Sequence, residues 1–180
     1  LVFVFYKLYK RYKSEGNVLY ANLCLGNFKS GYNIKRNPFK YPVDEIYSLC
    51  VSNKRTDFEN FLIDNFSYKT NDLLEIQGTR YLAQFNFEKA IEKFELMTIP
   101  TYTLHSDPFI IHINDYPNHD RYQPKENNYT KLTFAKKMIE LSDLSVKDKS
   151  NSDKYYYLLA NGYYNITHFG NSLLVADYYG

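Results

Sequence analysis

The residues best suited to bind a metal ion lie in residues 98–128, which contain four of the six prolines and three of the four histidines. The histidines are evenly spaced at seven residues, with aspartates between them. Imidazole and carboxylate groups are ligands for zinc and other divalent ions. The candidate ligands are His105, His112, Asp115, His119 and Asp120. The sequence lacks a compact pair, such as histidines at i and i+4 of one helix, so a solvated polar loop is the simpler interpretation and a metal-binding or hydrolytic site is the alternative.

Signatures of catalysis are missing from the rest of the chain. The sequence has no Gly-x-Ser-x-Gly motif, no glycine-rich phosphate loop and no His-Glu-x-x-His motif. His168 precedes Ser172 closely enough to suggest a base beside a hydroxyl, but Asn171 and Ser172 acting as helix caps explain the same residues more simply. We therefore expect a non-catalytic protein that needs no cofactor.

Charge and cysteine content exclude further classes of function. The 22 basic and 20 acidic residues are spread along the chain, and the cluster Lys7 to Lys13 is typical of the solvated face of one helix. We therefore expect no nucleic-acid partner. Cys24 and Cys50 are expected to be buried free thiols, with a single disulfide as the alternative in an oxidising compartment.

Tyrosine is the most unusual component, with 20 Tyr and 13 Phe but no Trp. Aromatic side chains must supply much of the packing, and many tyrosines should lie at the edge of the core with the hydroxyl in water. Codon bias in an AT-rich genome is one explanation for this composition. A tyrosine-lined binding groove is the other, and its candidate contacts are Tyr81, Tyr102, Tyr155, Tyr156 and Tyr163.

The elements that would position these residues are predicted to be helices. Hydrophobic periodicity predicts helices over about 1–14, 18–32, 43–51, 56–66 and 155–166, a helix that starts at 70–72 and leads into a helical pair over 78–94, and a further helix around 132–141. Thr56 and Glu59 form a capping-box pattern, and Asn171 is predicted to cap a last helix. Residues 109–113 are the one candidate for a short strand or an extended arm. The fold class is therefore all-α.

The clearest unit is a helical hairpin over residues 71–97, with a tight turn at Phe85-Asn86. Small residues are expected where the helices touch, and large rings fill the space around them. The residues at the offsets of a tetratricopeptide (TPR) repeat are Leu74, Gly78, Tyr81, Ala90 and Phe94, whereas Gln77 and Met97 depart from that pattern. One hairpin cannot bury its own apolar face, so the pattern predicts a TPR-like α-solenoid of stacked hairpins.

Three further segments resemble a group of large bacterial envelope proteins built from TPR-like helices. They are Asn37-Pro-Phe39, the stretch from Asp107-Pro-Phe109 to Tyr129–Phe134, and Leu158–Asn171. The resemblance implies a helical protein of the cell envelope and no particular activity. In that group the loop after the Asp-Pro-Phe segment carries paired cysteines, whereas residues 115–121 here contain none, so any role of those cysteines does not carry over.

Together these observations predict a helical scaffold or adaptor that binds a protein or peptide within a larger assembly, at the cell envelope or alternatively in the cytoplasm. The predicted organisation is helical hairpins over 1–97, an irregular proline-rich arm over 98–128 and further helices of the same stack over 129–180. The chain starts inside a helical pattern and stops without a charged tail, which is typical of a fragment. Membrane association is expected only through missing flanks or a partner.

Overall fold

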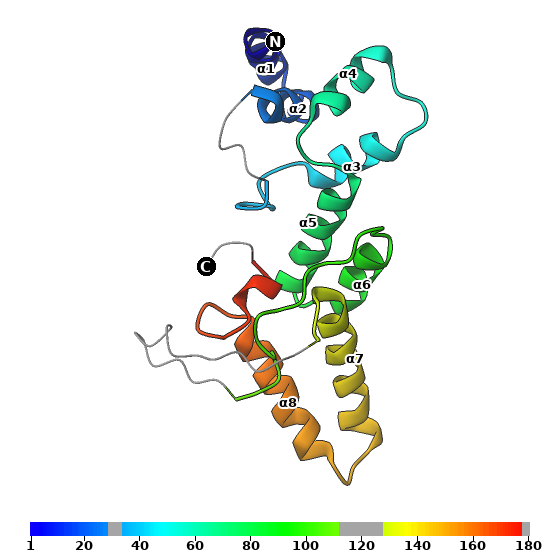
Figure 1. The fold of residues 1–180 in the computed structure, drawn as a ribbon, viewed down its shortest axis with the longest axis vertical. Helices are drawn as coiled ribbons and strands as arrows, with labels where there is room; N and C mark the ends of the chain where they lie inside the picture. The colour runs from blue at the N-terminus through cyan, green and yellow to red at the C-terminus, as the bar shows by residue number, and fades with distance from the viewer. Residues whose placement is uncertain (29–33, 112–127, 178–180) are drawn as a thin grey trace. The chain divides into compact units, whose positions relative to one another are not determined.

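The computed structural model describes residues 1–28, 34–111 and 128–177, and every regular element within these ranges is helical (Figure 1). The predicted all-α class is thereby confirmed for this part of the chain. The helices are α1 (Val2–Ser14), α2 (Val18–Phe28), α3 (Val43–Val51), α4 (Asp57–Asn65), α5 (Thr70–Ala83), α6 (Phe87–Glu95), α7 (Lys131–Lys147), α8 (Ser152–Asn165) and the short 3-10 helix η2 (Leu173–Val175).

Local capping chemistry sets several of these boundaries, as predicted. Before α4, the amide of Glu59 donates to Thr56 Oγ1 at 3.2 Å and the amide of Thr56 donates to Glu59 Oε2 at 2.7 Å, which completes the capping box. Before α6, Asn86 Oδ1 accepts from the amide of Lys89. Gly16 makes the turn after α1 with a φ of 72°, a conformation that glycine adopts without steric cost.

The chain divides into two compact units, residues 1–77 and 78–180. In the first unit, α1 and α2 form a hairpin and α4 packs against them through aromatic rings (Figure 1). Phe5 stacks on Phe61, with ring centroids 5.4 Å apart. Tyr12 packs edge-on against Tyr20, and both rings contact Phe58. Tyrosine thus fills the space between helices in this unit, as the composition predicted.

The second unit contains the sequential helices α6, α7 and α8, and α7 and α8 pack as a helical hairpin (Figure 1). Its core is formed mainly by aliphatic and phenylalanine side chains. The buried members of this core are Leu82, Phe87, Ala90, Phe94, Leu104, Phe109, Phe134, Ala135, Met138, Leu141, Leu159, Ile166 and Val175. Leu104 and Phe109 come from the segment before residue 112, so this part of the proline-rich arm belongs to the core of the unit.

The end of α5 approaches α6 at the glycine that the hairpin pattern singled out. A Cβ placed on Gly78 would lie 2.4 Å from a ring carbon of Phe94. No real Cβ contact is that short, so the ring occupies space that only glycine leaves open. The turn closes through amides of Phe85 and Asn86, which donate to the carbonyls of Leu82 and Tyr81.

Asparagine side chains from the end of α8 and the turn after it hold residues 107–110 in place. Asn165, which is fully buried, donates from Nδ2 to the carbonyls of Pro108 at 2.9 Å and Ile110 at 2.8 Å. Asn161 and Asn171 donate to the carbonyls of Phe109 and Asp107. We call these three residues the asparagine clamp.

The asparagine clamp corrects one prediction. Asn171 is not a helix cap, because its amide is directed to the carbonyl of Asp107. Ser172, which directly precedes η2, makes no side-chain cap hydrogen bond either. The amide of an asparagine satisfies a buried carbonyl as readily as it caps a helix, and here the tertiary partner prevails.

Candidate functional site

The most exposed cluster of aromatic residues in the second unit lies on α8. Tyr156 and Tyr157 are 55% and 52% exposed, and Tyr163 and Tyr164 are 41% exposed each. At about 100° per residue, these four side chains fall within an arc of about 120° on the helix surface. The small residue Ala160 lies within the same arc and is also exposed. We call the four tyrosines, together with Phe85, the α8 aromatic face.

Phe85 joins this face from the turn between α5 and α6. Its ring contacts that of Tyr163 edge-on at 5.4 Å, and it remains 51% exposed. Its φ of 56° is the one positive value at a non-glycine residue within the described ranges. A bulky residue in the left-handed region costs about 1–2 kcal/mol. The turn therefore holds a large apolar ring at the surface in a conformation that asparagine or glycine would adopt more easily.

The structure places two of the five predicted tyrosine contacts on this face, Tyr156 and Tyr163. The other three lie elsewhere in the second unit. Tyr81 packs against the core, with the ammonium of Lys89 5.7 Å from its ring centre. Tyr102 is exposed on one side, and the buried Lys131 ammonium lies 5.8 Å from its ring centre.

Tyr155 is turned toward the start of its helix and the end of α7. It packs against the core, and its hydroxyl donates to Asp148 Oδ2 at 2.9 Å. Hydrogen bonds from Ser150, Asn151 and Tyr155 lower the pKa of Asp148 to about 2. The same hydrogen bond raises the pKa of Tyr155. Tyr155 is therefore a structural residue that fixes the turn between α7 and α8.

Tyr157, Tyr164 and Phe85 were not among the predicted contacts. Tyr157 and Tyr164 directly follow Tyr156 and Tyr163. The seven-residue spacing from Tyr156 to Tyr163, which Tyr157 and Tyr164 repeat, was visible in the sequence. A consistent helical projection would have found both. Phe85 was recognised only as a turn residue, because its contact with Tyr163 joins segments 78 residues apart.

Of the five candidate metal ligands, only His105 lies in the described residues, where it is exposed. His112, Asp115, His119 and Asp120 lie outside them. Within the described ranges, no group of three or more His, Cys, Asp or Glu side chains is arranged to hold a metal ion. Asp107 Oδ1 accepts from the amide of Phe109 and so stabilises the local turn.

The structure also places the other candidate reactive groups. Ser172 Oγ donates to Asn171 Oδ1 at 2.8 Å, while His168 is exposed and packs edge-on against Phe169. Cys24 and Cys50 are free thiols, and Cys24 is buried as expected, whereas Cys50 is only half-buried. Burial alone raises the pKa of Cys24 to about 11, which keeps the thiol protonated and unreactive at neutral pH.

No helix within the described residues is both long enough and apolar enough to cross a membrane.

Comparison with protein-family models, with curated proteins and with solved structures finds no match for this chain.

Proposed function

We propose that this protein is a non-catalytic helical-repeat scaffold that binds a peptide segment of a partner protein on the α8 aromatic face. The observation that carries this proposal is the gathering of Tyr156, Tyr157, Tyr163 and Tyr164 on one exposed side of α8, with Phe85 beside them. Exposed aromatic clusters of this kind are typical of protein-binding surfaces, because each ring buries a large area at little cost in side-chain entropy.

The strained backbone at Phe85 supports the same proposal. Its φ of 56° holds a ring that is 51% exposed edge-on against Tyr163 of α8. Backbone strain of this kind clusters at ligand-binding sites, which supports a binding role for the Phe85 ring.

A peptide in an extended conformation fits this surface better than a rigid globular face. Tyrosine hydroxyls both donate and accept hydrogen bonds, so they can pair with the free backbone groups of an extended chain. Ala160 lies between the two tyrosine pairs, where its small side chain allows a partner side chain to approach the helix.

The repeat character of the chain is part of the proposal. The observations that support it are the close approach at Gly78, the Asn86 cap and the packing of α7 against α8 as a second pair of helices. We infer a TPR-like solenoid in a larger assembly, with the bacterial cell envelope as its location.

The test is recovery of the full chain from its native envelope, followed by identification of its stoichiometric partner and measurement of their affinity. Tyr156→Ala with Tyr163→Ala should weaken binding of that partner by at least about ten-fold. Tyr6→Ala in the first unit is the matched control, because Tyr6 and Tyr163 are equally exposed at 41%. Equal affinities of the double variant and the control would refute the proposal.

A further inference from the structure

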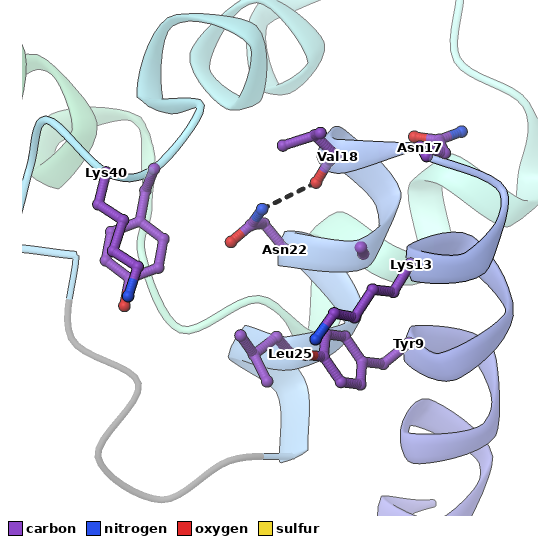
Figure 2. A pocket seen from close by; sticks show the side chains of 10 residues that line it. Tyr9, Lys13, Asn17, Val18, Asn22, Leu25 and Lys40 are labelled. Atoms are coloured by element: carbon purple, nitrogen blue, oxygen red, sulfur yellow. Dashed lines mark hydrogen bonds between the residues drawn. The ribbon is translucent and has the colours of Figure 1, made fainter.

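A cavity of about 380 Å³ in the first unit has the size of a small-molecule site (Figure 2). It lies beside the α1–α2 hairpin and is closed on another side by residues 40–41. The residues that line it are Tyr9, Lys13, Gly16, Asn17, Val18, Ala21, Asn22, Leu25, Lys40 and Tyr41.

All charged side chains that line this cavity are cationic. Lys13 comes from α1 and Lys40 from the segment before α3, so the two ammonium groups reach it from separate parts of the unit (Figure 2). Within the described residues, neither lysine forms an ion pair with a carboxylate. A second cavity among the described residues of this unit is instead lined by Asp44 and Glu45, so the two cavities differ in charge.

The start of α2 adds to this positive character. Gly16, Asn17 and Val18 line the cavity at the point where α2 begins. The amino end of a helix carries a partial positive charge, and α2 has no acidic residue in its first turn to offset it.

Aromatic and amide groups complete the lining. Lys13 Nζ lies 5.7 Å from the ring centre of Tyr9, so the aromatic ring and the cation form one side of the cavity. Asn22 Nδ2 donates to the carbonyl of Val18 at 2.8 Å, which fixes the orientation of its amide (Figure 2). Tyr41 supplies a second ring.

From this arrangement we propose that the cavity binds a small organic anion. Its carboxylate or phosphate group is held between Lys13 and Lys40, and its flat apolar part packs against Tyr9 and Tyr41. This inference is independent of the α8 aromatic face, which belongs to the other unit.

Titration of the full chain with phenyl phosphate and with benzoate, followed by two-dimensional NMR, tests the proposal. Benzyl alcohol serves as the neutral probe of similar shape. We expect saturable binding of at least one anion, with shifts at the amides of Gly16, Asn17 and Asn22. Lys13→Gln and Lys40→Gln should each weaken it by about five-fold, and added salt should weaken it further.

Lys10→Gln is the matched control. Lys10 lies on the same helix and its ammonium is 5.6 Å from the Tyr6 ring centre, which reproduces the Lys13–Tyr9 pair outside the cavity. This variant should bind the anions like the unmodified chain. The proposal fails if Lys10→Gln weakens binding as much as Lys13→Gln, if benzyl alcohol binds as tightly as the anions, or if neither anion saturates these amides below about 10 mM.

Discussion

Helices α1 and α8 are both rich in tyrosine, yet two of the three α1 tyrosines are half-buried against neighbouring rings, whereas four of the five α8 tyrosines are exposed. On α1, Tyr6 and Tyr9 contact Phe28 of α2, and Tyr12 contacts Tyr20 and Phe58. On α8, most tyrosines lie on the exposed side, and the helix is held by aliphatic residues and by the asparagine clamp on its opposite edge. The comparison shows that tyrosine content alone does not identify a binding surface, because the same residue type serves as packing when a partner helix is present.

The largest effect on the free energy of unfolding is expected when a buried aromatic side chain of α1 is removed. Phe5 is 1% exposed and stacks on Phe61, so Phe5→Ala should lower the free energy of unfolding by about 3–5 kcal/mol. Phe3→Ala on the same helix, at a residue that is 68% exposed, should change it by less than about 0.5 kcal/mol. Denaturant unfolding of both variants provides the measurement. Equal losses would show that α1 does not depend on this packing.

Substitutions in the asparagine clamp test how much the buried edge of α8 contributes to stability. Asn165→Ala leaves the carbonyls of Pro108 and Ile110 without their donor and should cost about 2–3 kcal/mol. Asn161→Ala removes one part-buried hydrogen bond and should cost about 1 kcal/mol. Hydrogen exchange and chemical unfolding would measure both. A smaller loss for Asn165→Ala than for Asn161→Ala would contradict the clamp.

The link between α2 and α4 should be sensitive to alkali. The Tyr20 hydroxyl donates to Glu59 Oε1 at 2.7 Å, and this hydrogen bond raises the pKa of Tyr20 to about 12 from its ordinary value of 10.0. Because the pKa of Tyr20 is higher in the folded protein than in the unfolded chain, its hydrogen bond to Glu59 contributes its full stability below pH 10. This contribution is lost as the pH rises toward about 12. Glu59→Gln should lower the Tyr20 pKa, which titration of phenolate absorbance would detect. An unchanged tyrosine titration in that variant would exclude the link.

The turn between α7 and α8 should be sensitive to acid instead. The pKa of Asp148 is lowered to about 2 from 3.8, so its contribution to stability is present above pH 3.8 and is lost as the pH falls toward 2. Tyr155→Phe removes one donor and should raise the Asp148 pKa, which NMR titration of the carboxylate would follow. Tyr156→Phe, one residue further along, should leave it unchanged.

The smallest effect on stability is expected on the α8 aromatic face itself. Tyr157→Ala removes a side chain that is 52% exposed and should change the free energy of unfolding by less than about 0.5 kcal/mol. Thermal unfolding would measure this change. A large loss would mean that the face is part of the core and would remove the basis for a partner surface.

Local patterns predicted the helices well where capping and turn chemistry were complete. Thr56 and Glu59 placed the start of α4, and Asn86 placed the start of α6, because the groups that satisfy the first amides of a helix are close in sequence. The start of α8 was missed by three residues. It begins at Ser152 rather than near Tyr155, and its N-cap residue Asn151 makes no side-chain cap hydrogen bond.

The candidate site was less predictable from the same information. Tyr156 and Tyr163 were named in advance, but Tyr155 and Tyr81 proved to be packed residues. Neighbouring tyrosines on one helix differ by about 100° in direction, so their roles depend on which side the adjacent helix covers. That information lies in residues far away in the sequence.

By itself, the sequence determined the helical class of residues 1–28, 34–111 and 128–177 and a hairpin with a close approach at Gly78, because periodicity, caps and small residues act over a few positions. Only the tertiary structure decided that Asn165 secures a distant segment, that Phe85 joins α8 at the surface, and that Lys13 and Lys40 share a cavity. Each of these depends on contacts between residues separated by tens of positions, and the packing of the folded chain alone brings them together.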